Sequence, residues 1–224
     1  LHYKRQKYQP GQYCTAPQFT LLSIPMATLL NQRRLRIGTW NVLANWWYVF
    51  KYYTPTTDTK HRQWKHREQL SEAYLRGLDA DILCLQEINP ENVKEDGTGT
   101  ILPGEKGDDL AFARNLGYDF AMEGDGNDFM RCCVLYRKSL YRQPAQEGKK
   151  KTTATSRKFV SVRLEPIPGS RLEGSKPLVV VCTHLPACDS SQSNGVQVLA
   201  QALKATKKIF MPGDAFVLGG DFNL

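Results

Sequence analysis

Short apolar runs alternate with helix-like segments along the chain, and polar, glycine-rich stretches separate them. The runs are rich in β-branched and aromatic residues and have the length of single strands. We expect strands at residues 36–42, 81–86, 118–122, 132–137, 158–164, 178–183 and 215–218. The run 178–183 is apolar or small up to its final threonine, which predicts a central strand that is buried on both faces.

Three other segments have the composition of helices, and the longest covers residues 60–78. Its apolar side chains recur near a helical period beside a basic face, at Trp64, Leu70, Tyr74 and Leu78. This pattern predicts an amphipathic helix that packs on a sheet. Further helices are expected at residues 108–116 and 196–210, and exposed connections at residues 91–106 and 147–157. The succession of strand, helix and strand predicts a single α/β domain.

The composition shows a chain of ordinary hydrophobicity with an excess of basic residues. The chain has 224 residues, of which 41% are hydrophobic, enough for one domain with a sizeable core. Its net charge of +8 would attract a phosphate-rich partner, although basic proteins without such a partner are as common. The most apolar stretch, residues 19–30, contains Pro25 and is far shorter than the ~20 residues that cross a bilayer, so no membrane span is expected.

The cysteines and the N-terminal segment give indications of the cellular compartment. None of the six cysteines forms a C-x-x-C pair, which favours reduced thiols over a zinc knuckle or a disulfide scaffold. No acidic residue precedes Asp58, and we expect residues 1–35 to form a basic N-terminal arm. A transit-peptide remnant has the same composition. We therefore expect an intracellular protein, cytoplasmic or nuclear, with the mitochondrion as the alternative.

Four polar sites lie at or directly after apolar strand runs. They are Asn41, Gln86-Glu87, Thr183-His184 and Asp221 with Asn223. Because loops at strand ends converge on one crevice, we expect one cleft. Glu87 and Asp221 are hard oxygen donors of the kind that Mg²⁺ prefers, Asn41 and Asn223 can orient a water or a phosphate oxygen, and His184 can donate to a phosphoryl group. Singly, each residue also fits a turn, a cap or a structural role, so the combination carries the prediction.

Together the four sites resemble the successive signatures of the endonuclease/exonuclease/phosphatase superfamily. The signatures are Thr39-Trp40-Asn41, Leu85-Gln86-Glu87, Thr183-His184-Leu185 and Gly220-Asp221-Phe222-Asn223, in this order. The segment from Asn41 to Glu87, with Trp64 and Arg67 within it, is similar to the branch that contains nocturnin, the Angel proteins and the Ccr-type deadenylase. The resemblance covers residues 36–224.

This resemblance implies an α/β fold, namely a four-layer αββα sandwich of the DNase I-like type. It also implies a metal cofactor, which is Mg²⁺ or, as a substitute for it, Mn²⁺. It implies hydrolysis of a phosphoester by in-line attack of water. In the family's pattern Glu87 is the principal metal ligand, while Asp221 orients the attacking water and bears on the metal. Asn41 and Asn223 hold the metal's water and the phosphate, and His184 stabilises the transition state. The metal-side residues are thus Glu87, Asp221 and Asn41, the catalytic ones His184, Asp221, Asn223 and Asn41, and the substrate-binding ones Asn223 and His184.

The chain departs from the pattern in two places. Met130-Arg131-Cys132-Cys133 stands where the branch tends to have Asp-Gly-Cys-Ala, so substrate contacts from that turn do not carry over. The family's closing Ser-Asp-His signature has no counterpart before Leu224. We therefore expect residues 36–224 to form the N-terminal part of the domain, with a fold that is incomplete at the C-terminus.

Three functions are compatible with these residues. The leading hypothesis is a Mg²⁺-dependent phosphoesterase that acts on RNA, as a 3′ exonuclease or poly(A) deadenylase. A phosphatase for a nucleotide or another small phosphorylated metabolite would use the same side chains. The alternative from another class is a catalytically incomplete RNA-binding or scaffold module. The oligomeric state is not predicted.

Overall fold

The structure is a computed structural model, and it describes ten stretches of the chain. They are residues 20–26, 33–42, 64–88, 94–95, 101–102, 110–122, 131–145, 152–156, 158–186 and 192–223. These stretches build an α/β fold with two mixed sheets, together with a two-stranded ribbon of β4 (Lys94–Glu95) and β5 (Ile101–Leu102).

The first sheet has five strands, and only one neighbouring pair is parallel. In spatial order the strands are β1 (Thr20–Met26), β2 (Arg33–Asn41), β3 (Ile82–Ile88), β7 (Arg131–Arg137) and β6 (Tyr118–Met122). β2 and β3 are parallel, with Asn41 opposite Gln86, so the polar ends of these two strands lie side by side. The other pairs are antiparallel.

The second sheet also contains one parallel pair, at its edge. Its order is β12 (Ala215–Asp221), β11 (Leu178–His184), β10 (Phe159–Pro166) and β8 (Tyr141–Arg142), with β9 (Thr153–Ser156) also paired to β10. β12 runs parallel to β11 with Asp221 opposite His184. The C-terminal ends of both parallel pairs thus carry the polar residues that the sequence singles out.

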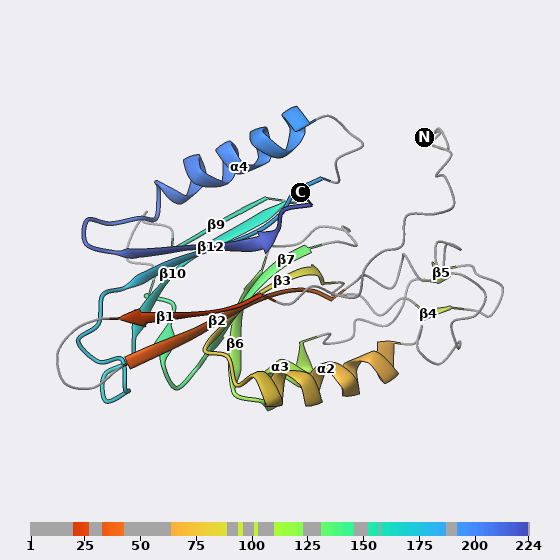
Figure 1. Cartoon of the computed structure of the whole chain (residues 1–224), viewed down its shortest axis with the longest axis horizontal. Helices are drawn as coiled ribbons and strands as arrows, with labels where there is room; N and C mark the ends of the chain where they lie inside the picture. The colour runs from red at the N-terminus through yellow and green to blue at the C-terminus, as the bar shows by residue number, and fades with distance from the viewer. Residues whose placement is uncertain are drawn as a thin grey trace.

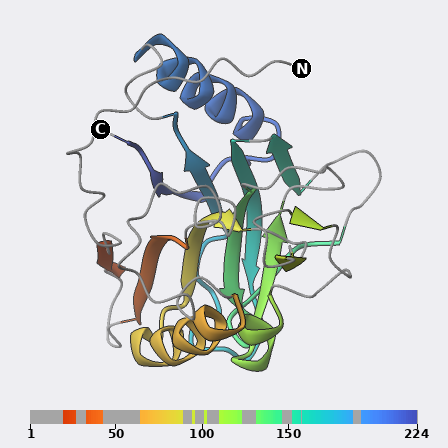
Figure 2. The same ribbon diagram turned by 90° about the vertical axis from the view of Figure 1, so that its right-hand side faces the viewer.

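The two sheets pack face to face around one apolar cluster. The cluster takes alternate residues of each strand, such as Ile82 and Cys84 from the first sheet and Val180 and Cys182 from the second. Figure 1 shows α4 (Gln192–Thr206) against the second sheet, while α2 (Trp64–Leu78) and α3 (Ala111–Asn115) lie along the first. The view turned by 90° shows the same arrangement of sheets between helices (Figure 2). None of the described helices is long and apolar enough to cross a membrane.

Gly219 sets a close contact between the sheets. A Cβ atom at Gly219 would lie 2.9 Å from Cys84 Sγ, which faces it from the other sheet. Real Cβ atoms keep a larger distance, and the buried Cys84 side chain has no flexible end that can move aside. Glycine at this position therefore permits the observed approach of β12 to β3.

The predicted strands are all present. The run 178–183 forms β11, which is buried along its whole length, as expected for a central strand. β1, β4, β5, β8 and β9 were not expected; β4 and β5 lie in residues 91–106 and β9 in residues 147–157, the two segments predicted as exposed connections. β1 contains Pro25, which an edge strand tolerates because one side of the strand needs no backbone donor. β1 and the start of β2 lie within residues 20–35, the segment assigned to an N-terminal arm, and where the domain begins stays a prediction.

The long helix ends at Leu78 as predicted, but its buried face differs. Leu70 and Tyr74 are exposed, at 54% and 44%, whereas Ser71 and Leu75 point into the core. The buried stripe is therefore shifted by one residue at Leu70 and Tyr74, whereas Leu78 packs against the core as predicted. Residues 60–63 and the side chain of Trp64 lie outside the described residues. Tyr74 instead contacts the Trp40 ring, with centroids 5.7 Å apart.

Cys84, Cys132, Cys133 and Cys182 are free and buried. Cys14 and Cys188 lie outside the described residues.

Candidate active site

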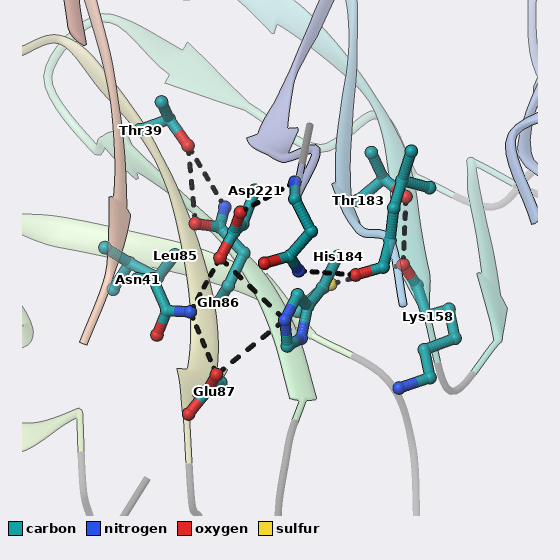
Figure 3. A network of polar contacts seen from close by, with 12 residues as sticks. Thr39, Asn41, Leu85, Gln86, Glu87, Lys158, Thr183, His184 and Asp221 are labelled. Atoms are coloured by element: carbon teal, nitrogen blue, oxygen red, sulfur yellow. Dashed lines mark hydrogen bonds and ion pairs between the residues drawn. The ribbon is translucent and has the colours of Figure 1, made fainter. Parts of the chain in front are cut away.

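Asn41 joins the two sheets at the ends of their parallel pairs. Its side-chain nitrogen donates a 2.9 Å hydrogen bond to Glu87 Oε1 and another 2.9 Å hydrogen bond to Asp221 Oδ2. Glu87 belongs to the first sheet and Asp221 to the second (Figure 3). Three of the four polar sites that the sequence indicates, those of Asn41, Glu87 and Asp221, therefore meet in one place.

His184 faces the same two carboxylates. Its Nε2 atom lies 3.7 Å from Glu87 Oε1 and 3.9 Å from Asp221 Oδ2. Burial lowers the pKa of His184, and although the two carboxylates oppose this, the pKa stays below its ordinary value. The imidazole is therefore neutral at pH 7. Its other nitrogen, Nδ1, is buried and has no hydrogen-bond partner among the described residues.

An irregularity in β3 turns Glu87 toward this site. The pairing of β3 with β7 shifts between Leu85 and Ile88, and Glu87 has a φ of 60°. Non-glycine residues rarely adopt this left-handed conformation, and such strain is concentrated at functional sites. Without the irregularity, strand alternation would place Gln86 and Glu87 on opposite faces of the sheet.

Gln86 lies in the core next to the site and joins the strands that carry it. Its Nε2 atom donates to Thr39 Oγ1 at 3.1 Å, to the Cys84 carbonyl oxygen at 3.0 Å and to Cys182 Sγ at 3.2 Å. The side chain is 1% exposed, so it positions neighbouring strands and does not reach a ligand. Gln86 links β2, β3 and β11 directly beneath Asn41 and His184.

Asn223 lies beside Asp221 and orders its carboxylate. The backbone N–H of Asn223 donates to Asp221 Oδ1 at 3.1 Å, and its side-chain nitrogen donates to the Leu185 carbonyl oxygen at 2.6 Å. Leu185 in turn donates its N–H to the Asp221 carbonyl oxygen at 2.9 Å. These bonds close the turn after β12 onto the turn after β11, and they leave Asp221 Oδ2 for Asn41.

Two basic residues near the site did not emerge from the sequence. Lys158 precedes β10 and lies next to His184, whose pKa its charge lowers further. Arg131 is buried opposite Ile88 at the start of β7, and it belongs to the segment in which the chain departs from the family's pattern. In the sequence Lys158 follows the Lys149–Lys151 run by seven positions, and this basic context is a weak signal for it.

The donor set fits a hard divalent cation. Two carboxylates and one amide converge, and Mg²⁺ prefers oxygen ligands of this kind. Within the described residues, no group of three or more His, Cys, Asp and Glu side chains is arranged as a ready-made metal cage. Mg²⁺ does not need one, because it keeps several of its water ligands when it binds to one or two carboxylates.

Fold and site together define an α/β protein with the polar cluster of a phosphoesterase. The chain belongs to the endonuclease/exonuclease/phosphatase family, whose sequence model matches residues 38–224. This is a family of metal-dependent phosphoesterases. No curated protein matches the chain.

Several solved structures share the fold. The chain is similar to ANGEL2, described as a 2′,3′-cyclic phosphatase in complex with adenosine-2′,3′-vanadate, at 16% identity and a TM-score of 0.60; the match covers 94% of this chain and 57% of that one. The human nocturnin catalytic domain with bound sulfate matches at 18% identity and a TM-score of 0.53, over 93% of this chain and 68% of that one. TDP2 of D. rerio with a single-strand DNA product matches at 18% identity and a TM-score of 0.51, over 85% and 61%. At these identities the likeness concerns the fold, and the chain spans little more than half the length of ANGEL2.

Proposed function

We propose that the chain is a Mg²⁺-dependent phosphoesterase that hydrolyses phosphodiester bonds of RNA. The observation that supports this most is the contact of one Asn41 nitrogen with both Glu87 and Asp221, next to a neutral His184. Residues from both sheets thus form a compact anionic site beside a hydrogen-bond donor. A cation and a phosphate group can bind there together.

Glu87, Asp221 and the Asn41 side-chain oxygen would hold Mg²⁺, or Mn²⁺ in its place. Rotation of the Asn41 amide would exchange its nitrogen for its oxygen at the carboxylates. When bound, the cation polarises the phosphate and stabilises the charge that develops during hydrolysis.

The remaining roles belong to the protein's own polar groups. Asp221 Oδ2 accepts hydrogen bonds and can orient the attacking water, while the Asn223 N–H holds the other oxygen of the same carboxylate. His184 is neutral and donates from Nε2–H to a phosphoryl oxygen as charge develops on it. Asn41 and Asn223 hold phosphate and water in place.

We also infer the layering of the part of the domain that this chain contains. Separate apolar clusters lie between the two sheets, under α2 and α3, and under α4. They support a four-layer αββα sandwich of the DNase I-like type over residues 36–224, preceded by the basic arm.

A single-stranded RNA is the substrate we favour, cleaved from the 3′ end as in poly(A) removal. The net charge of +8 favours a polyanion. Hydrolysis of a labelled oligoadenylate with Mg²⁺ tests the proposal. We expect Glu87→Gln to reduce the rate by about 10²-fold or more, because a metal-side carboxylate becomes neutral. The matched control is Glu173→Gln, since Glu173 is exposed and lies in the turn before β11. Equal rates for wild type and Glu87→Gln would refute the proposed site.

A nucleotide phosphatase is the second candidate, and the likeness to ANGEL2, a 2′,3′-cyclic phosphatase, favours it. Rates with adenosine 2′,3′-cyclic phosphate and with oligoadenylate, measured on the same preparation, separate the two. Binding of oligoadenylate without hydrolysis of either compound would instead favour the RNA-binding or scaffold module.

A further inference from the structure

Three side chains form a row across adjacent strands at the end of the second sheet. Phe159 pairs with Thr183 in the antiparallel β10–β11 register, so the next residues outward, Lys158 and His184, are cross-strand neighbours. The His184 N–H donates to the Lys158 carbonyl oxygen at 2.9 Å. His184 is in turn opposite Asp221 in the parallel register with β12. The row therefore runs from a lysine, through an imidazole, to a carboxylate.

The row lies on the inner face of the sheet. Val160, Val162 and Leu164 of β10 belong to the cluster between the sheets, and Lys158 is in phase with them. Val180 and Cys182 of β11 belong to the same cluster and are in phase with His184. Lys158 is thus on the face that carries the Asp221 and Asn41 contacts. Figure 3 shows its side chain on the other side of His184 from Asn41 and Asp221.

The backbone of Lys158 is firmly held. Besides the His184 N–H, its carbonyl oxygen accepts hydrogen bonds from Thr183 Oγ1 at 3.1 Å and from Cys132 Sγ at 3.4 Å. Three donors from two sheets thus fix the start of the side chain. Its ammonium group forms no ion pair with a carboxylate in the described part of the chain.

We propose that Lys158 binds the substrate phosphate, with its ammonium group in contact with a non-bridging oxygen of the phosphate that lies against His184. This inference rests on the proposed function. A cation at the Glu87 and Asp221 end and Lys158 at the opposite end would contact the phosphate from two sides, and His184 between them would add a hydrogen bond. The ligand class is a phosphoester with an accessible anionic oxygen, in an oligonucleotide or in a mononucleotide.

Binding measured across a salt series tests this directly. The probes are fluorescein-labelled oligoadenylate and adenosine 5′-monophosphate, each with Mg²⁺, and the protein carries Glu87→Gln so that hydrolysis does not interfere. For the oligonucleotide, log affinity falls linearly with log salt, with a slope of about −0.7 per phosphate neutralised on a single strand. We expect Lys158→Met to make this slope shallower by about 0.7 and to weaken binding about tenfold at low salt.

Two further variants separate phosphate contact from general charge and from misfolding. Lys158→Arg should retain the wild-type slope because it keeps the cation. Lys176→Met removes the same charge at the exposed, opposite end of β11 and should leave the slope unchanged. An unchanged slope in Lys158→Met, an equal change in Lys176→Met, or loss of the slope in Lys158→Arg would overturn the proposal.

The outcomes also separate this inference from the proposed function. Wild-type protein that binds the oligonucleotide with a Lys158-dependent slope but hydrolyses nothing would refute the phosphoesterase and retain the phosphate contact. If hydrolysis depends on Glu87 but the salt slope is the same in Lys158→Met as in wild type, the phosphoesterase is retained and the phosphate contact of Lys158 is refuted. The probe that gains affinity from Lys158 identifies the source of the phosphate.

Discussion

Asn41 and Asp221 are 180 positions apart in the sequence, and the Asn41 side-chain nitrogen donates a 2.9 Å hydrogen bond to Asp221 Oδ2. The same nitrogen donates to Glu87 Oε1. One neutral donor therefore lies between two carboxylates that would otherwise face each other across the sheets. Its removal should raise the repulsion between them, and a divalent cation should relieve that repulsion.

The first prediction concerns Asn41→Asp. In EDTA we expect this variant to unfold at a lower temperature than wild type, with a loss of about 1–3 kcal/mol, because a third carboxylate replaces the donor. Addition of MgCl₂ should raise its melting temperature by more than that of wild type, since the cation binds a more negative site. Differential scanning fluorimetry measures both shifts. Asn115→Asp, at an exposed position of α3, is the control, and a Mg²⁺ shift no larger than wild type in Asn41→Asp would contradict the prediction.

The second prediction concerns Gly220, which is packed against the neighbouring strand. A Cβ atom there would lie 2.1 Å from the Thr183 carbonyl oxygen, which is backbone and cannot move aside. We expect Gly220→Ala to lower the free energy of unfolding by about 2–4 kcal/mol in urea titrations, and to reduce hydrolysis because the neighbouring Asp221 is displaced.

A second glycine supplies the control of opposite sign. Gly77 is the last residue but one of α2, and a Cβ atom there meets nothing within 4 Å. Gly77→Ala should therefore raise the free energy of unfolding by about 0.5–1 kcal/mol. Similar changes in the two variants would mean that β12 does not approach β11 as described.

The third prediction follows from the lowered pKa of His184. The unfolded chain binds a proton at this residue near pH 6.5, and the folded chain does so only at lower pH. Stability is therefore lost as pH falls below about 6.5 and is retained above it. In EDTA, the free energy of unfolding of wild type should fall between about pH 7.5 and 5.5 by up to about 1 kcal/mol more than that of His184→Gln. An equal pH dependence of the two proteins would argue against a buried, neutral imidazole.

The fourth prediction concerns the ion pair that holds the turn before β12. Arg163 donates to both carboxylate oxygens of Asp214, at 2.9 and 3.2 Å, and the Asp214 side chain is 2% exposed. Asp214→Asn should cost about 1–3 kcal/mol because a largely buried guanidinium loses one of its two charged partners, while Glu165 Oε1 stays 2.7 Å from Arg163 Nη1. Glu72→Gln breaks the exposed helix pair with Arg76 and should cost less than about 0.5 kcal/mol. Comparable losses in the two variants, measured by urea unfolding, would contradict this account.

Strands with a clear apolar run could be predicted from the sequence. β6 has the predicted bounds, Tyr118–Met122, and β11 is buried as expected because its apolar run signals coverage on both faces. β1 was missed because its proline argues against an interior strand, and only the sheet order reveals that it is an edge strand. The face of α2 was misplaced by one residue because Ser71 is polar yet points into the core beside Leu75.

The residues of the candidate site could be listed from motifs, but their contacts could not. Nothing local in the sequence places the Asn41 nitrogen on Glu87 and Asp221 together, because that contact depends on how the sheets stack. Glu87 reaches the site through an irregularity in β3, and no glycine, proline or other turn residue in this strand predicts that irregularity. Lys158 has no motif and becomes notable only through its register with His184.

The contact of Gly219 with Cys84 lies in the core directly behind the site, and it keeps the two sheets at the spacing on which the site depends. Glu87 and Asn41 belong to one sheet, and His184 and Asp221 to the other. Any core substitution that spreads the sheets by a few tenths of an ångström will therefore also separate the groups that meet in the cleft. Substitutions at Gly219 and at Glu87 should be thermodynamically non-additive, although the two residues do not perform the same task. A substitution that enlarges a side chain in this core therefore also changes the geometry of the candidate site.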